Sequence, residues 1–320
     1  MKAIGGYFEL ELAQRSSLPF ADNAIYLNSG RTAFEYILLS LGHAAKVYLP
    51  YYTCDVVINK LRKHNIPFSF YSINTQLEID KLIDLKADEY IIVNNYFGIK
   101  DEYIRSLAAR YNGQMIVDNA QALYAKHYPE TKAFYSPRKY VGIPDGGIAY
   151  CDVVPSITLE QDYSHERCAH LLKRIDVDSQ CGYADFKAVS RELSTLPIRT
   201  MSKLTRTLLQ SIDFESIKQK RRANFEMLHN ALGDSNLLNI PHATTFECPM
   251  VYPYMTSKQG LREHLLKNNI FVATYWPNVL EWSKDKPSQA KLAEQILPLP
   301  IDQRYDKEDT NRIIQTIQTI

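Results

Sequence analysis

One lysine of the chain stands in a turn made of residues that restrict the backbone. Lys139 lies in the segment FYSPRKYVGIPDGGIAY (134–150), where Pro137 precedes it and Gly146 and Gly147 follow it. Proline fixes its own φ angle, and a pair of glycines allows the chain to turn tightly. Most proteins leave the flexible and strongly hydrated lysine side chain in solvent. Lys139 is therefore either a surface residue without a role or an amine that is held in place for chemistry.

Two further features lie at the ends of expected elements, where an open parallel sheet binds its ligands. Gly30 and Arg31 open a helical pattern, and a helix N-terminus attracts phosphate, while Asp118 ends the apolar run QMIVD. A lysine amine forms a Schiff base with pyridoxal phosphate, and a carboxylate keeps the pyridine nitrogen protonated so that the ring accepts electrons. Taken singly, these residues indicate no more than a surface lysine, a helix cap and a helix start. Their combination predicts a pyridoxal-phosphate site.

The first half of the chain alternates between two kinds of apolar pattern. Short apolar runs typical of strands are followed by stretches in which apolar residues recur at helical spacing. We expect strands at 46–50, 67–73, 90–94, 114–118 and 133–136, and helices at 31–41, 54–64 and 101–111. Such alternation is typical of β-α-β units around a parallel sheet, so the fold class is α/β.

The second half has a different texture. Charged helical stretches dominate from about residue 155 to 232, and the pair Arg221 and Arg222 is most simply a solvated helix face. The last eighty or so residues indicate a compact α+β unit. Its strand-like segments are 245–255 and 269–276, and its helical segments are 257–268 and 306–320. We place the boundary between 195 and 235, with a large domain at 1–215 and a small one at 216–320.

The composition of the chain indicates which classes of binding partner to expect. Apolar residues make up 45% of the 320 residues, which supports a large core. The 37 Lys and Arg residues nearly balance 36 Asp and Glu residues, so no nucleic-acid or membrane partner is expected. The five cysteines contain no C-x-x-C pair, which disfavours a metal site and a disulfide framework. Without a signal-peptide pattern or a run of about 20 apolar residues, the sequence predicts a soluble, cytoplasmic protein.

Six segments together resemble the DegT/DnrJ/EryC1/StrS family of pyridoxal-phosphate sugar aminotransferases, within the aspartate-aminotransferase superfamily of fold type I. NSGRTAFEYILLSLG resembles the family's S-G-T-A-A-L, VYLPYYTCDVVINKL its V-x-x-P-x-Y-T, and NNYFG its H-L-F-G. IVDNAQAL resembles V-x-D-A-A-Q-A, YSPRKYVGIPDGG resembles H-P-x-K-x-x-x-x-x-D-G-G, and LPLPIDQRYDKED resembles L-P-x-x-x-x-x-T-x-E-D. The D-x-A-Q and P-x-K blocks together are the most specific part. The resemblance implies a large domain, with a mostly parallel sheet between helices, and a smaller C-terminal α+β domain.

The resemblance also assigns roles to residues at matching positions. Lys139 is the expected Schiff-base lysine, and Asp118 is the partner of the pyridinium nitrogen. Gln121 is expected to contact the cofactor ring or its phenolic oxygen. Gly30 and Arg31 are expected to bind the phosphate through backbone N–H groups.

Several positions depart from the family pattern. Phe134 stands where the family has a phosphate-binding serine, and Ser136 is the available substitute. Cys54 replaces an aromatic residue that covers the cofactor, and Asn95 replaces a common histidine. Both are still expected to contact the cofactor. Arg199, beside the family's R-M-S segment, is the candidate for contacting a partner subunit.

The resemblance predicts transfer of an amino group, most simply from glutamate, to a nucleotide-linked keto sugar by a homodimer. The helices in 190–232 offer apolar residues for the dimer contact, namely Leu204, Leu208, Ile212, Phe225 and Leu228. The candidate residues of the substrate pocket are Tyr7, Phe8, Arg199, Tyr275 and Trp276. One alternative is a pyridoxal-phosphate enzyme with a different keto substrate or a dehydration, although dehydratase relatives carry histidine instead of the lysine. A second alternative is a non-catalytic paralogue that serves as a binding module, which the unusual Phe134 and Cys54 keep open.

Overall fold

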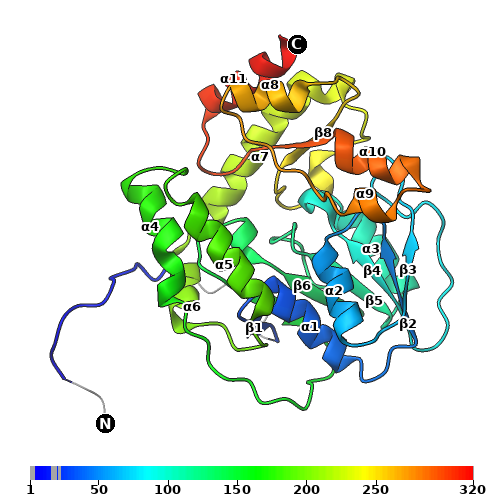
Figure 1. Cartoon of the computed structure of the whole chain (residues 1–320), viewed down its shortest axis with the longest axis vertical. Helices are drawn as coiled ribbons and strands as arrows, with labels where there is room; N and C mark the ends of the chain where they lie inside the picture. The colour runs from blue at the N-terminus through cyan, green and yellow to red at the C-terminus, as the bar shows by residue number, and fades with distance from the viewer. Residues whose placement is uncertain (1–3, 16–19, 21–22, 320) are drawn as a thin grey trace.

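The computed structural model describes residues 4–15, 20 and 23–319, and its main body is built on a seven-stranded sheet (Figure 1). The sheet order is β1-β7-β6-β5-β4-β2-β3; β7 runs antiparallel to both of its neighbours, and the remaining pairs are parallel. The strands are β1 Ile25–Leu27, β2 Lys46–Pro50, β3 Phe68–Tyr71, β4 Glu89–Asn94, β5 Met115–Asn119, β6 Lys132–Tyr135 and β7 Gly147–Tyr150. The predicted α/β fold with a mostly parallel sheet is confirmed.

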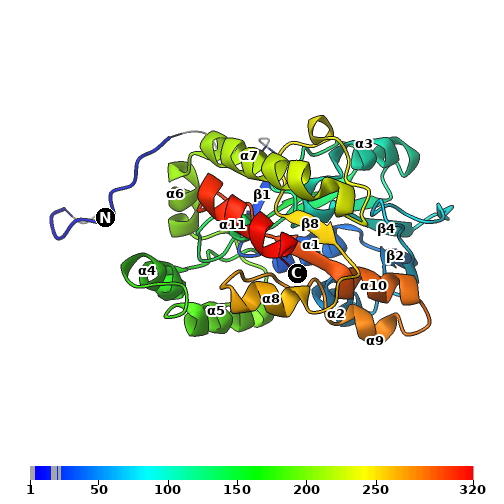
Figure 2. The ribbon, with the colours of Figure 1, turned by 90° about the horizontal axis from the view of Figure 1, so that it is seen from above.

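Helices cover the sheet, and a two-stranded antiparallel sheet of β8 and β9 lies in the C-terminal part of the chain (Figures 1 and 2). The helices are α1 Gly30–Ser40, α2 Asp55–Lys63, α3 Asp101–Arg110, α4 Ala169–Asp176, α5 Tyr183–Thr195, α6 Lys203–Ser211, α7 Phe214–Leu232, α8 Leu261–Lys267, α9 Val279–Trp282, α10 Pro287–Gln295 and α11 Lys307–Gln318. The small sheet consists of β8 Tyr252–Met255 and β9 Ile296–Leu299. Among the described residues, no helix has both the length and the apolar character that crossing a bilayer requires.

Both faces of the large sheet are buried, because successive side chains of a strand point to opposite faces. Ile92 and Ile116 join the cluster formed with α1 and α2. Their neighbours Ile91, Val93 and Val117 belong to the cluster on the other face. The polar residues at the strand ends are therefore held on a rigid frame.

The N-terminus of α1 is fixed against the sheet by a capping box and a close backbone approach. The Ser29 hydroxyl accepts a hydrogen bond from the Thr32 N–H at 3.1 Å, and the Thr32 hydroxyl accepts one from the Ser29 N–H at 3.0 Å. At the start of β7, a Cβ on Gly147 would lie 2.0 Å from the Ser29 carbonyl oxygen, so only glycine fits there. Gly147, the second glycine of the Gly-Gly pair, thus permits the close approach of α1 to β7.

A buried ion cluster joins α1 to α2. Glu35, on α1, accepts hydrogen bonds from Lys60 and Lys63 of α2 and contacts Nε2 of His64 at 2.9 Å. Burial alone would raise the pKa of this carboxyl, but the three hydrogen bonds outweigh it and lower the pKa to about 2. The ionised carboxylate therefore stabilises the contact between the two helices.

We expect this cluster to give the protein a measurable acid sensitivity. Because the pKa of Glu35 in the folded protein lies below its ordinary value of 4.5, the stabilisation is complete above pH 4.5 and is lost as the pH falls toward 2. Glu35→Gln should lower the free energy of unfolding at pH 7 by about 2 kcal/mol and flatten its pH dependence below 4.5. Urea unfolding at several pH values measures both, with Glu102→Gln on the surface of α3 as the control. An unchanged pH dependence in Glu35→Gln would refute the assignment.

The C-terminal part differs from the sequence prediction at one expected strand. Residues 269–276 form no strand; the partner of β8 is β9, with Tyr254 opposite Leu297. The backbone of this segment is satisfied by other groups, since the Arg262 guanidinium donates to the carbonyls of Val272 and Ala273 at 3.2 and 2.7 Å. Because it pairs with no strand, this segment can line the pocket described below.

The arginine pair on α7 is also not a solvated face. The Arg221 side chain is wholly buried and donates to the carbonyl oxygens of Met250 and Tyr140 at 2.8 and 3.1 Å. Arg222 donates to three backbone carbonyls, those of Phe246, Glu247 and Ala243. Both side chains bind the irregular segment before β8, whose carbonyls lack partners in a regular ladder.

Candidate active site

A pocket of about 500 Å³ opens at the carboxyl ends of the parallel strands. Asn94 ends β4, Asp118 lies near the end of β5 in register with it, and Ser136 directly follows β6. Gly30, at the start of α1, lines the same pocket together with Lys139. The structure thus brings the three predicted features, an anion site, a carboxylate and a lysine, into one place.

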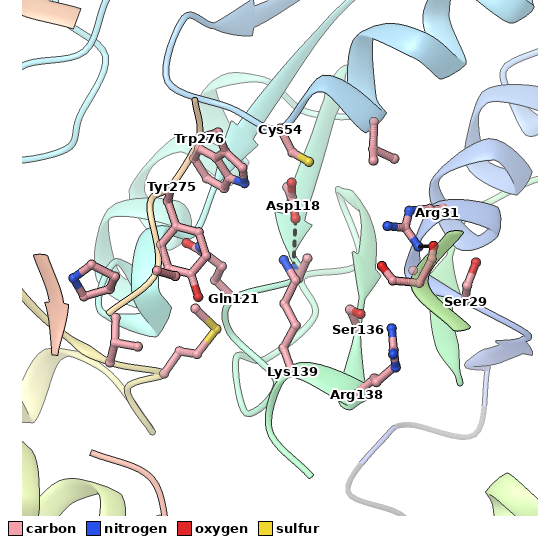
Figure 3. Close-up of a pocket in the computed structure, with 18 of the residues that line it drawn as sticks. Ser29, Arg31, Cys54, Asp118, Gln121, Ser136, Arg138, Lys139, Tyr275 and Trp276 are labelled. Carbon is pink, nitrogen blue, oxygen red and sulfur yellow. Dashed lines mark hydrogen bonds between the residues drawn. The ribbon is translucent and has the colours of Figure 1, made fainter. Parts of the chain in front are cut away.

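Asp118 and Lys139 face each other across this pocket (Figure 3). The Asp118 side chain is buried, and its Oδ1 accepts a hydrogen bond from the Ala120 N–H at 2.9 Å. Burial raises the pKa of the Asp118 carboxyl, while the Lys139 charge and the Ala120 N–H act in the opposite direction. Lys139 is exposed within the pocket, so a ligand can reach its amine. The positive charge of the amine acts on the Asp118 carboxyl across the pocket.

Gln121 offers an unused donor to the pocket. Its Oε1 accepts a hydrogen bond from the Phe97 N–H at 3.0 Å, which fixes the orientation of the amide. Its Nε2 is buried and has no hydrogen-bond partner among the described residues. Buried N–H groups are rarely left unpaired, so this one indicates a missing acceptor in the pocket. Tyr275 and Trp276 line the pocket beside it, and their contact with a substrate stays a prediction (Figure 3).

Ser136 lies against the start of α1. A Cβ on Gly30 would come 2.9 Å from the Ser136 Cβ and 3.1 Å from its Oγ, so the hydroxyl is next to the free N–H groups of the helix. Phe134 instead belongs to the core, where its ring lies 5.1 Å from that of Phe34. Ser136 is therefore the hydroxyl available at this helix N-terminus.

Arg138 is a pocket residue that the sequence analysis missed. It comes directly before Lys139, in a short 3₁₀ turn at Pro137–Lys139, and its side chain enters the pocket beside Ser136 (Figure 3). Its Nε and Nη2 atoms are buried without a hydrogen-bond partner among the described residues. The signal available in the sequence was a second cation inside the restricted P-x-K turn.

Cys54 lines the pocket near Lys139. It is the N-cap residue of α2, and its thiol donates a hydrogen bond to Asp55 Oδ1 at 3.3 Å. Burial raises the pKa of this thiol to about 11, against a smaller opposing effect of the Lys139 charge. The thiol is therefore protonated at neutral pH and presents a small, uncharged surface where the family has an aromatic ring.

Asn95 also lines the pocket, but its amide is used by the protein itself. Its Nδ2 donates to Asp101 Oδ1 at 2.7 Å and to Asn119 Oδ1 at 3.2 Å, and its Oδ1 accepts from the Lys100 N–H at 3.1 Å. Both N–H bonds of the amide are thereby occupied. Its predicted contact with a cofactor stays a prediction, and the amide mainly orders the loop after β4.

Three predicted site residues lie outside this pocket. The Arg199 guanidinium lies 3.5 Å from Glu160 and 3.6 Å from Asp162, so within one chain it forms ion pairs. Tyr7 and Phe8 are 100% and 91% exposed on the N-terminal arm, which extends away from the body (Figure 1). That Arg199 contacts a partner subunit stays a prediction.

The chain shares its overall fold with several solved structures, among them sugar aminotransferases. S. venezuelae DesV, solved in complex with a ketimine intermediate, is 18% identical, covers 94% of this chain and 85% of its own, and has a TM-score of 0.65. A putative sugar aminotransferase from Streptococcus pneumoniae, in its PMP form, is 15% identical over 92% and 85% of the chains, with a TM-score of 0.67. A DegT DnrJ EryC1 StrS aminotransferase from Brucella abortus is 16% identical over 92% and 85%, with a TM-score of 0.61.

No protein-family model matches the sequence, and no curated protein matches it. The similarity to known proteins therefore lies in the structure. The fold that the sequence resemblance implied is confirmed by these structural matches.

Proposed function

We propose that the protein is a pyridoxal-phosphate-dependent aminotransferase. The observation that carries the proposal is the Lys139 amine facing the buried Asp118 carboxylate, in a pocket that the N-terminus of α1 closes at one end. The unpaired atoms of the pocket fit this cofactor. The Gln121 Nε2 is a donor for its phenolic oxygen, and the unpaired nitrogens of Arg138 are donors for its phosphate.

Each residue of the pocket has a role that its surroundings support. When bound, pyridoxal phosphate supplies an electron sink for the carbon that loses a proton. Asp118 would hold a proton at the pyridine nitrogen, because an ionised carboxylate in a buried site favours the charged form of its partner. Lys139 Nζ would bind the cofactor aldehyde and then carry the proton to and from the substrate, since its long side chain is exposed in the pocket.

For the reaction partners, we propose glutamate as amino donor and a keto sugar linked to a nucleotide as acceptor. The support is that the similar solved structures include sugar aminotransferases. The walls formed by Tyr275 and Trp276 suit a sugar ring, because aromatic faces pack against its C–H groups while leaving its hydroxyls free.

The test of this function combines a cofactor assay and a substrate screen. The purified protein incubated with pyridoxal phosphate should absorb in the visible, and borohydride should remove that absorbance. With glutamate and a set of nucleotide-linked keto sugars, mass spectrometry should detect one aminated product. A protein that binds the cofactor without aminating any sugar would contradict the acceptor, and one that binds no cofactor would contradict the whole function.

We further propose that the working unit is a homodimer, for a reason that differs from the one offered by the sequence. Phe225 and Leu228 of α7, which were available for a dimer contact, are buried within the chain. Large apolar side chains are instead exposed on α4, α5 and the segment between them, namely Leu172, Ile175, Val177, Tyr183 and Phe186. A patch of this kind indicates a protein–protein contact.

Light scattering at micromolar concentration should therefore give twice the mass of one chain. Ile175→Asp combined with Tyr183→Asp should shift the protein toward monomer, because buried carboxylates oppose the contact. Leu237→Asp, at an exposed apolar residue far along the chain, is the matched control and should leave the mass unchanged. A monomeric wild type would refute the proposal.

A further inference from the structure

Two arginines flank the N-terminus of α1 without a carboxylate partner among the described residues. The Arg31 side chain makes one hydrogen bond, from Nη1 to the Ser190 carbonyl oxygen at 3.4 Å. The Arg138 side chain makes none from its buried Nε and Nη2 atoms. Both line the pocket, and both flank Ser136 (Figure 3). Guanidinium groups of this kind bind oxyanions through parallel N–H bonds.

Helix α5 holds both arginines in place. The Phe186 ring lies 4.8 Å from the Arg138 guanidinium carbon, and the Ser190 carbonyl binds Arg31 one turn further along the helix. A cation stacked on an aromatic ring and a cation bonded to a carbonyl are fixed in direction, although neither is neutralised. The two side chains are therefore oriented before any ligand arrives.

Among the described residues, neither guanidinium group of this pair forms an ion pair with a carboxylate. Burial lowers the pKa of the Arg138 guanidinium to about 10, and repulsion by Arg31 adds to the effect, whereas Asp145 opposes it. Asp145, however, already binds Arg167 at 2.7 Å and the Thr205 hydroxyl. Two like charges near a helix N-terminus, which is itself positive, favour the binding of an anion between them.

We infer that Arg31 and Arg138 bind the doubly charged phosphate of the cofactor together with the N-terminus of α1 and Ser136. The inference rests on the proposed function and adds to it that the two guanidinium groups take the place of the hydroxyl lost at Phe134.

The test compares pyridoxal phosphate with pyridoxal, which lacks the phosphate. Arg138→Met should weaken equilibrium binding of pyridoxal phosphate, measured by absorbance, about 10- to 100-fold, as expected for hydrogen bonds to a charged group. Binding of pyridoxal should stay unchanged. Arg138→Lys should recover part of the loss, because it restores the charge without the fork geometry. Arg191→Met, at an exposed arginine of α5 outside the pocket, is the matched control.

A second readout needs no cofactor. Inorganic phosphate should raise the melting temperature of the wild type and of Arg191→Met, and should have a smaller effect on Arg138→Met. The melting temperature without phosphate also reports whether each variant folds. Equal losses for pyridoxal phosphate and pyridoxal, or a full phosphate response in Arg138→Met, would overturn the inference while leaving the proposed function intact. A wild type that binds no pyridoxal phosphate would overturn both.

Discussion

Replacing Lys139 by alanine is expected to give a folded protein that no longer links pyridoxal phosphate covalently. The side chain is exposed in the pocket and has no part in the core, so its loss should leave the melting temperature nearly unchanged. Amino transfer should fall by roughly 10³-fold or more, because both the covalent link and the group that moves the proton are removed.

Borohydride reduction followed by peptide mapping checks the assignment directly. In the wild type the pyridoxyl group should be found on the peptide that carries Lys139, and in Lys139→Ala on no peptide. Lys126→Ala, at an exposed lysine outside the pocket, should behave like the wild type. Label on any other lysine of the wild type would show that the amine is misassigned.

The Asp118→Asn variant is expected to retain the covalent link but to transfer amino groups roughly 10²- to 10⁴-fold more slowly. The carboxylate is buried at the end of β5, and its charge is what favours a protonated pyridine nitrogen. An amide has nearly the same shape and keeps the hydrogen bond from the Ala120 N–H, but it carries no charge. The loss should therefore lie in the chemical step and not in cofactor affinity.

Stopped-flow measurement of the half-reaction with glutamate separates the two effects. Asp101→Asn is the matched control, because Asp101 is also a carboxylate whose pKa burial raises and which accepts backbone and amide hydrogen bonds, yet it does not line the pocket. It is expected to change stability more than rate. If Asp118→Asn reacted as fast as the wild type, Asp118 would serve only to order the turn after β5.

The pattern of the sequence was sufficient for the frame of the site. The runs ending at Asn94 and Asp118 are continuous and apolar because these strands are buried on both faces, so they stood out without any alignment. Parallel strands end at the same edge of a sheet, so their order alone predicts that Asp118 lies near the turn of Lys139. Gly30 could be predicted as part of the site because the helical pattern of α1 begins there.

The residues that come from distant parts of the chain were not accessible in this way. Arg138 reads as a surface cation unless Phe186, some fifty residues away on α5, is known to cover it. The segment 269–276 has the apolar composition of a strand, but Arg262 takes its carbonyls, and composition does not reveal that competitor. In both cases tertiary contacts override a local preference.

The hydrogen bonds to the Tyr140 carbonyl group connect the proposed large and small domains at the site. It accepts hydrogen bonds from Arg221 at 3.1 Å and from Gln303 at 2.9 Å, and both donors lie beyond the proposed boundary at residue 215. Because Tyr140 directly follows Lys139, the backbone that carries the reactive amine is anchored by the C-terminal third of the chain. A fragment of residues 1–215 would keep the sheet and the aspartate but lose these two anchors. Replacing the C-terminal part by that of a relative would therefore change how the backbone at Lys139 is held, and not only which substrate the pocket accepts.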